Sequence, residues 1–256
     1  MPVFERMTVA SPGEFLYRDK KLGDTQAITI ATAPDVFSPT STTVLLLRAA
    51  RRSLVPPPRS VLDLGCGSGI VALVLAQHVP PGTVICASDL SAAAVRLTRD
   101  NARRHGVTID CRCGSLFEPW NGERFDLIMD DVAGVAEPLD RISGWYPESV
   151  PSSCGPDGTR WILQVLDQAA DHLTPAGQLL FPGGTLARES EVLERARSRF
   201  ATVVQLEEQR YPLSEELLAH GALLDELQQA GRIQLEQRGS RLCWSARIYL
   251  AKEPRT

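Results

Sequence analysis

The sequence predicts an α/β fold of three layers, in which helices cover both faces of a seven-stranded, mostly parallel sheet with an antiparallel edge strand. Short apolar runs rich in β-branched residues alternate with segments whose apolar residues recur at helical spacing. Near the end of the chain, two strand-like runs follow each other without an ordinary crossover helix, which indicates an antiparallel pair at one edge of the sheet.

The strand-like runs begin with SVLDLG and end with SARIYLA. They cover residues 60–65, 83–89, 108–113, 125–131, 177–183, 202–208 and 245–251. Helical spacing of apolar residues is found at 70–78, 92–105, 159–173 and 186–200. The late segment PLSEELLAHGALLDELQQAG opens with Pro and Ser and closes with Gly231, so it predicts an extra helix at about 213–230.

The chain divides into two expected parts. Residues 1–34 contain the alternating stretch QAITIA, which favours a small β-hairpin, and we expect this extension to lie over the front of the molecule as a lid. Residues 35–256 carry the alternation of strands and helices and are expected to form one α/β domain.

Charge and cysteine content exclude several classes of protein. The 27 basic residues are scattered among 31 acidic ones, for a formal net charge of −4, so we expect no nucleic-acid partner. The local group of Arg48, Arg51, Arg52 and Arg59 is interpreted as a solvated helix face. The six cysteines form no CxxC pair and have no histidine at ligand spacing, so we expect no metal and a reducing compartment.

The first residues lack a basic region followed by an apolar one, and no apolar run approaches the roughly 20 residues that cross a bilayer. We therefore expect a cytoplasmic protein with no membrane partner.

The strongest local signal is VLDLGCGSGI at residues 61–70, where a strand enters a glycine-rich turn before a helix. Gly65 and Gly67 allow the backbone to come close to a ligand, and Asp89 ends the next strand, where a carboxylate can accept hydrogen bonds from ribose hydroxyls. Asp63 would repel a pyrophosphate but suits a cationic amine, so S-adenosylmethionine is favoured over a dinucleotide.

These residues, together with the strand FDLIMDD, resemble the class I S-adenosylmethionine-dependent methyltransferases, which implies a Rossmann-like fold and makes residues 35–256 the catalytic domain. Within this superfamily, a longer set of stretches is similar in order and spacing to the protein-glutamine N5 methyltransferases and their small-molecule relatives. They span roughly residues 35 to 185 and read DVFSPTSTTVLLL, NARRHGV, GSLFEPW, ERFDLI and GPDGTRWILQVLDQAADHLTPAGQLLF.

The resemblance implies roles for eight residues in holding S-adenosylmethionine. Asp63, Gly65 and Gly67 would line its methionine end, and Asp89 would hold the ribose. The residues expected along the adenine are Leu90, Ser115 and Leu116, and Thr43 is expected near the carboxylate end. The family has Glu-Asp where this chain has Ser41-Thr42, and Asp at the position of Ser115.

A larger departure follows the strand at 125–131. The family places Asn-Pro-Pro-Tyr there to recognise a planar NH2 group, whereas this chain has Asp131-Val132-Ala133-Gly134. We therefore do not carry over the family's glutamine substrate. A carboxylate accepts hydrogen bonds only, so Asp130 or Asp131 is predicted to hold an amine and take its proton, although one of them can instead cap the turn.

Trp145 and Tyr146 lie in the Pro/Ser/Gly-rich segment SGWYPESVP. We predict that they close over the pocket and face the sulfonium through cation–π attraction; the alternative is that they are packed loop anchors.

The leading functional hypothesis is transfer of the methyl group of S-adenosylmethionine to an amine or carboxylate of a small molecule in specialised metabolism. The alternative needs no partner beyond the cofactor: a cyclase that converts S-adenosylmethionine to azetidine-2-carboxylate and methylthioadenosine. A third hypothesis is a non-catalytic binding module. Methylation of a protein or an RNA is a further alternative, because a substrate groove cannot be identified from the sequence. The sequence leaves the oligomeric state open.

Overall fold

The computed structural model describes residues 13–143, 145–146, 150 and 152–255. Its main sheet runs in the order β5-β4-β3-β6-β7-β10-β8, with β9 paired to β10. The strands are β3 (Ser60–Leu64), β4 (Val84–Asp89), β5 (Asp110–Cys113), β6 (Phe125–Asp130), β7 (Leu173–Gly184), β8 (Phe200–Pro212), β9 (Glu236–Arg238) and β10 (Arg241–Pro254).

The strands from β5 to β7 are parallel, and β10 is antiparallel to both β7 and β8. The predicted α/β class, mostly parallel sheet and antiparallel edge are therefore confirmed. In detail, β10 lies between β7 and β8. The chain passes from β7 to β8 without pairing these two strands, and the last strand then fills the position between them.

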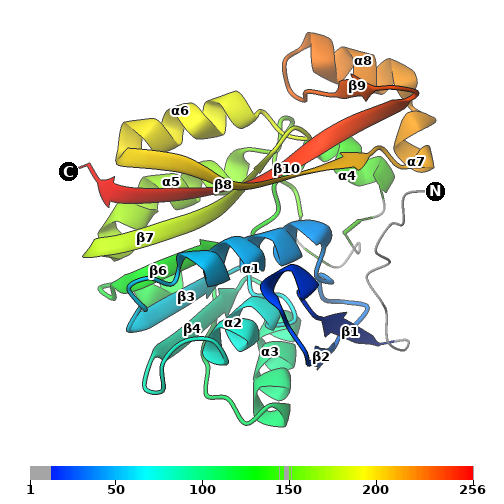
Figure 1. Ribbon diagram of the computed structural model, residues 1–256. Coiled ribbons are helices and arrows are strands. Elements are labelled where there is room, and N and C mark those ends of the chain that lie inside the picture. The colour runs from blue at the N-terminus through cyan, green and yellow to red at the C-terminus, as the bar shows by residue number, and fades with distance from the viewer. Residues whose placement is uncertain (1–12, 144, 147–149, 151, 256) are drawn as a thin grey trace.

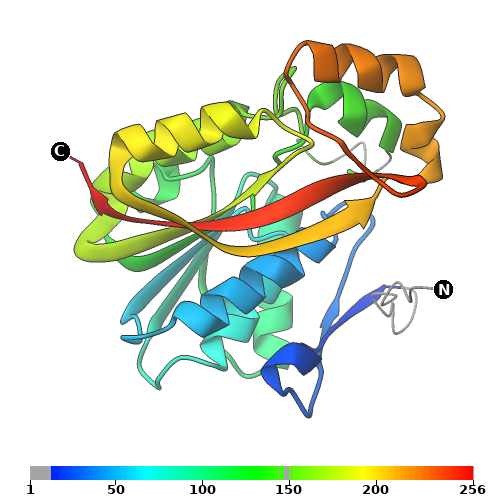
Figure 2. The same ribbon diagram turned by 45° about the horizontal axis from the view of Figure 1, so that its top comes forward.

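Helices cover both faces of this sheet, as Figures 1 and 2 show. One face carries α1 (Ser41–Ser53), α2 (Ile70–Ala76) and α3 (Ala92–Arg104), and the other carries α5 (Arg160–His172) and α6 (Glu189–Arg199). Because side chains alternate along a strand, Val61 packs with the first group of helices, whereas Leu62 and Leu64 pack with the second. Two apolar cores result, one on each face.

A third apolar cluster lies at one end of the molecule, at the upper right of Figure 1. It joins α4 (Glu137–Ser143), α7 (Glu215–Leu218) and α8 (Gly221–Gln229), which we call the cap. Leu139 of α4 packs in one cluster with Leu217 of α7 and with Leu224 and Leu227 of α8. Residues 213–230, expected to hold one helix, thus contain two short ones.

The N-terminal hairpin consists of β1 (Glu14–Tyr17) and β2 (Ile28–Ala31), joined through a 3₁₀ turn at Lys20–Leu22. Phe15, Tyr17 and Ile30 are buried in the core that also contains α1 and α2. The Asn101 side chain of α3 accepts from the Ala31 N–H and donates to the Ala31 carbonyl, both at 3.0 Å. The hairpin is therefore docked against the helices; the domain boundary after residue 34 stays a prediction.

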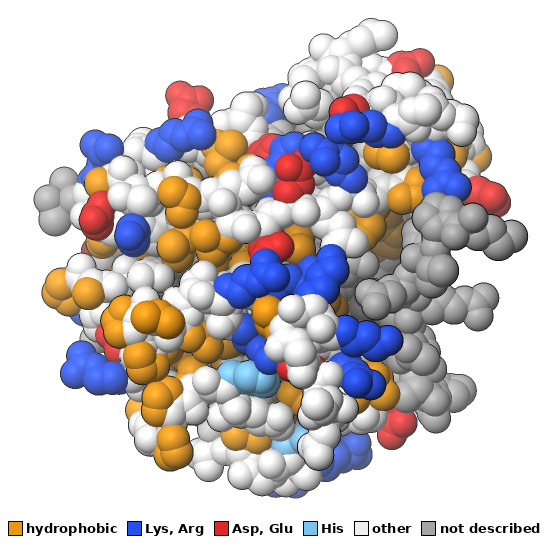
Figure 3. All heavy atoms as spheres, viewed as in Figure 1, with side chains coloured by type: hydrophobic (Ala, Val, Ile, Leu, Met, Phe, Trp, Pro, Cys, Tyr) orange, Lys and Arg blue, Asp and Glu red, His pale blue; other side chains and the backbone are white. Residues whose placement is uncertain are grey.

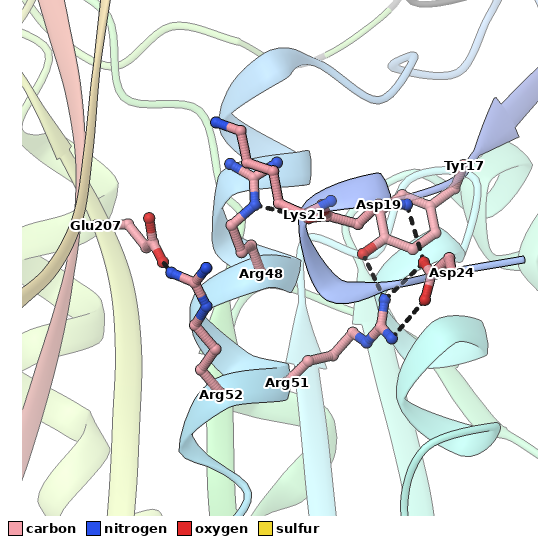
Figure 4. A network of polar contacts seen from close by, with 8 residues as sticks. All are labelled: Tyr17, Asp19, Lys21, Asp24, Arg48, Arg51, Arg52 and Glu207. Carbon is pink, nitrogen blue, oxygen red and sulfur yellow. Dashed lines mark hydrogen bonds and ion pairs between the residues drawn. The ribbon is translucent and has the colours of Figure 1, made fainter.

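Ion pairs fasten this hairpin to α1 (Figure 4). Arg48 Nε donates to Asp19 at 2.7 Å, and both terminal nitrogens of Arg51 donate to the Asp24 carboxylate, at 2.7 and 2.8 Å. The interpretation of this group as a solvated helix face is wrong for Arg48 and Arg51, whose side chains are 8% and 10% exposed. Acidic residues from the hairpin cover and neutralise them.

Basic side chains nevertheless gather across the middle of the face that is seen in Figure 3, with acidic side chains among them. Arg52, for example, is half exposed and pairs with Glu207 of β8. This face is therefore one of mixed charge.

None of the helices among the described residues is long and apolar enough to cross a membrane.

We expect Arg48→Met to lower the free energy of unfolding by about 3 kcal/mol, because it leaves the Asp19 carboxylate buried without its cation. Arg52→Met, on the same helix, is the matched control and should cost about 1 kcal/mol or less, since the Arg52 side chain is half exposed and solvent screens its ion pair with Glu207. Urea denaturation of both variants measures the difference. Equal losses would contradict the assigned role of the Arg48–Asp19 pair.

Candidate functional site

The parallel strands β3, β4 and β6 end at one edge of the sheet, and the loops that follow them meet there. The Asp131 N–H donates to the Leu64 carbonyl at 3.0 Å, which extends the pairing of β3 and β6 by one residue. Directly after it, Gly65 adopts a φ of 74°, and a Cβ there would lie 3.1 Å from the Val132 side chain. The glycine allows the two loops to touch.

One cavity opens over this glycine turn, and we call it the glycine-loop cavity. It has a volume of about 100 Å³. Its described lining residues include six of the eight predicted cofactor contacts: Gly65, Gly67, Asp89, Leu90, Ser115 and Leu116. The structure thus brings together residues from the ends of three strands, as the sequence motif predicts.

Asp89 stands at the rim of the glycine turn with both oxygens engaged. One oxygen accepts from the Gly67 N–H at 2.9 Å and the other from the Ser91 N–H at 2.8 Å. Each carboxylate oxygen has further lone pairs, so both can still accept from a ligand hydroxyl. Burial raises the pKa of Asp89 despite these two bonds.

The other two predicted cofactor residues lie behind the cavity wall. Asp63 is fully buried, and its Oδ2 accepts from the Ala72 N–H of α2 at 3.1 Å. Burial, followed by the charge of Asp131, raises the pKa of Asp63 far above its usual range. Thr43 is buried in the first turn of α1 and contacts Asp131. Direct contact of either residue with a cofactor stays a prediction.

A second cavity, of about 390 Å³, lies beside the first at the end of β6. We call it the aromatic cavity, after the four rings of Phe37, Trp145, Tyr146 and Trp244. The loop before α1, the loop after β6 and the ends of β7 and β10 all contribute to its walls. No residue in the described part of the hairpin segment, 13–34, lines either cavity.

Asp131 lines both cavities, at the point where they adjoin. Its Oδ2 accepts from the Thr43 hydroxyl at 2.8 Å. Burial raises the pKa of Asp131 to about 7, and the bond from Thr43 opposes that rise. The carboxylate therefore titrates close to neutrality.

Asp130 lines the aromatic cavity only, and its residue exposure is 0%. Its Oδ1 accepts from the Val132 N–H at 3.1 Å, whereas its Oδ2 has no hydrogen-bond partner among the described residues. Burial, and next the charge of Asp131, raise the pKa of Asp130 to about 8. Asp130 thus caps the turn through one oxygen, and its other oxygen is buried without a partner among the described residues.

Tyr146 lies between the cavities and lines both. Its ring stacks on Phe37 with the centroids 4.8 Å apart. Trp145 lines the aromatic cavity. Its ring centroid lies 6.2 Å from that of Trp244, and its side chain packs against the cap cluster. Both aromatic residues are therefore packed, and both face cavity space.

Several lining residues were not identified from the sequence. Phe37 precedes α1, Trp161 lies in α5, and Trp244 lies in β10, so they come from distant parts of the chain. Phe37 lies in the stretch VFSPT, which is part of the resemblance to the methyltransferase family. That resemblance is the one sequence signal that could have identified Phe37 as a site residue. For the two tryptophans, no local pattern distinguishes a cavity wall from an ordinary core position.

Residues 27–131 match the methyltransferase small domain family. The chain is 32% identical over 151 residues to the release factor glutamine methyltransferase of Geobacter sulfurreducens, covering 57% of this chain and 52% of that protein. Identity to the corresponding Bordetella pertussis protein is 39% over 160 residues, covering 60% and 58%. The Symbiobacterium thermophilum ribosomal protein L11 methyltransferase is 31% identical over 169 residues, covering 66% and 46%.

The chain thus spans about half the length of these curated relatives. Solved structures with lower sequence identity share the fold. A ribosomal protein L11 methylase from Lactobacillus delbrueckii aligns with a TM-score of 0.51 and 19% identity, over 85% of this chain and 81% of that one. A T. thermophilus 16S rRNA methyltransferase, in complex with AdoMet and guanosine, aligns with a TM-score of 0.57 and 17% identity, over 94% and 50%.

The relatives correct one expectation. Their names specify protein substrates, namely a release factor and the ribosomal proteins L11 and uL3. A small-molecule acceptor, and equally a reaction with no partner beyond S-adenosylmethionine, is contradicted by this finding. The expectation depended on the replacement of Asn-Pro-Pro-Tyr by residues 131–134, which bears on the chemical group of the acceptor but does not specify whether that group belongs to a small molecule or to a protein.

The predicted resemblance, in contrast, is confirmed: residues 27–131 match the methyltransferase small domain family, the curated relatives are named methyltransferases, and the solved methyltransferase structures share the fold.

Proposed function

We propose that this protein binds S-adenosylmethionine in the glycine-loop cavity and transfers its methyl group to a nitrogen atom of a protein substrate held in the aromatic cavity. The observation that carries this proposal is the position of Asp131, which lines both cavities where they adjoin. A group at that point can contact the acceptor beside the donor. The names of the relatives support a protein as the acceptor.

The residues of the glycine-loop cavity fit S-adenosylmethionine. Leu90 and Leu116 offer apolar walls for a flat ring, and Asp89 has lone pairs for ribose hydroxyls. Among the described lining residues there are two carboxylates, Asp89 and Asp131, and no Lys, Arg or His. That charge suits a cationic sulfonium and would repel the pyrophosphate of a dinucleotide. When bound, S-adenosylmethionine would supply an electrophilic methyl group, because that group is attached to a positively charged sulfur.

Asp131 is assigned the role of the group that receives an N–H of the acceptor. Its carboxylate is held by Thr43 and so presents a fixed acceptor to the aromatic cavity. With a pKa of about 7 it is partly ionised near neutrality, as a general base requires. Positioning and proton removal by Asp131 are the chain's own contribution to catalysis.

The surrounding aromatic residues exclude water from the same point. Tyr146 and Phe37 stack across the junction of the two cavities, and Trp145 covers the aromatic cavity beside Trp244. Exclusion of water strengthens the electrostatic effect of Asp131 on the acceptor nitrogen. An electron-rich ring beside the junction also favours a positive charge there.

The proposal predicts that the purified protein transfers tritium from methyl-labelled S-adenosylmethionine to protein in a bacterial lysate. Asp131→Asn should lower this rate by about 100-fold, since an amide cannot take the proton, and this loss should exceed any loss in S-adenosylmethionine affinity measured by calorimetry. Asp126→Asn, at the opposite end of β6, is the matched control and should keep the rate. Label that appears only in small molecules would overturn the proposed function.

The pH dependence gives a second prediction. Asp131 acts as its ionised form, so kcat/KM should fall as the pH drops below about 7. Thr43→Val removes the bond that opposes the rise in this pKa, so the acidic limb should move to higher pH by about half a unit or more. Thr43→Ser keeps the hydroxyl and should restore the original profile.

Thr174→Val is the control for this experiment, because Thr174 donates an equivalent bond of 2.8 Å to Asp126 away from the cavities. Its acidic limb should coincide with that of the unmodified protein. An unchanged profile in Thr43→Val would contradict the assignment of the limb to Asp131.

A further inference from the structure

We propose that the acceptor is a primary ammonium at the end of an unbranched side chain, the chemistry of lysine, and that Asp130 is the residue that selects it. This inference rests on the proposed function and names the substrate class for the same site. It gives the two adjacent carboxylates different roles. Asp131 receives the proton, and Asp130 provides the negative charge that positions the acceptor nitrogen.

The charge of the aromatic cavity is the first observation. Its described lining residues include three carboxylates, Asp130, Asp131 and Glu189, and no Lys, Arg or His. Arg247 pairs with Glu189, but neither aspartate has a basic partner in the described residues. Burial raises the pKa of both aspartates, and a cation beside them favours their ionised form. Once ionised, two carboxylates without a basic partner bind a cation in preference to a neutral group.

The free oxygen of Asp130 is the second observation. Asp130 is fully buried, yet its Oδ2 has no partner among the described residues, although the residue lines a cavity of about 390 Å³. A buried polar atom without a partner is costly, and a ligand that supplies an N–H removes that cost. The Oδ1 atom is already fixed by Val132, so the carboxylate is oriented before any ligand arrives.

The aromatic walls are the third observation. Phe37, Trp145, Tyr146 and Trp244 surround the cavity, and most of the remaining lining is aliphatic or glycine. The methylene stem of a lysine can pack along such walls while its ammonium lies near the carboxylates, and aromatic faces attract that cation. A shorter polar chain would leave the apolar walls without contacts.

An ammonium also matches the pair of carboxylates better than a carboxamide does. It carries three N–H donors and a positive charge, whereas an amide carries two donors and a carbonyl oxygen that would be repelled by Asp130. The number of donors and the charge both favour the amine.

Methyl transfer to the ammonium requires loss of a proton and release of neutral S-adenosylhomocysteine. The bound R–NH3⁺ gives one proton to the Asp131 carboxylate, which becomes a carboxylic acid and leaves R–NH2 hydrogen-bonded to Asp130. The nitrogen lone pair forms the new N–C bond to the methyl group while the S–C bond breaks, and its electron pair stays on sulfur. The products are R–NH2⁺–CH3 and neutral S-adenosylhomocysteine.

The first test identifies the modified residue. Proteins that the enzyme labels with tritiated S-adenosylmethionine are hydrolysed enzymatically, and their amino acids are separated by chromatography. We expect label in N-methylated lysine. Label in N5-methylglutamine would overturn this inference and leave the proposed function standing, whereas failure to label any protein would overturn the proposed function itself.

The second test measures the role of Asp130 without turnover. Calorimetry at about pH 9, where Asp130 with its pKa of about 8 is largely ionised, compares n-butylammonium chloride with the neutral isostere butyramide. It should show binding of the cation and at least 10-fold weaker binding of the amide. Asp130→Asn should weaken n-butylammonium binding by about 10-fold or more, because a charge-assisted hydrogen bond is lost, and leave S-adenosylmethionine affinity unchanged. Asp126→Asn is again the control. Equal binding of the two probes, or an unaltered affinity in Asp130→Asn, would overturn the inference.

A pH series shows whether the Asp130→Asn variant folds. The folded pKa of Asp130, about 8, is above the usual value of an unfolded aspartate, so its ionisation destabilises the protein as the pH rises from about 4 to 8. The variant lacks this ionisation. Its thermal midpoint relative to the unmodified protein should therefore increase across that window, and the binding comparison is made at a pH where both are folded.

Discussion

The geometry of the site depends on the final hydrogen bond between β3 and β6, in which the Asp131 N–H donates to the Leu64 carbonyl at 3.0 Å. This bond places the first residue after β6 beside the first residue of the glycine turn. Gly65 then lets the two loops touch, because a side chain there would meet Val132. The glycine-loop cavity and the aromatic cavity therefore adjoin at Asp131, and Thr43 holds its side chain from the α1 side.

The same arrangement concentrates negative charge at one edge of the sheet. Asp63, Asp89, Asp130 and Asp131 come from three neighbouring strands, and the pKa of each is raised chiefly by burial. Such a cluster is unfavourable by itself, since like charges and desolvation both oppose ionisation. A cationic sulfonium and a cationic acceptor would each relieve it. The cost in stability and the proposed preference for cations thus have one physical origin.

The cap and the hairpin serve the site in different ways. Trp145, which packs with the cap cluster, and Trp244 line the aromatic cavity, so the cap supports one wall of that cavity. The described part of the hairpin instead braces α1, the helix that carries Thr43, through Asp19 and Asp24 (Figure 4). Its arginine partners looked like a solvated surface in the sequence because their acidic partners lie about thirty residues away.

The sequence by itself determined the order of strands and helices, the glycine turn and Asp89, because these depend on local periodicity and on contacts between elements that are adjacent along the chain. Only the tertiary structure decided which aspartate lines both cavities and which keeps an oxygen without a partner, since that depends on the side of the sheet to which each residue points. The tertiary structure also placed Phe37 and Trp244 in the lining of the aromatic cavity. Residues so far apart in the sequence meet only because β10 returns to the sheet beside β7 and α1 packs across it.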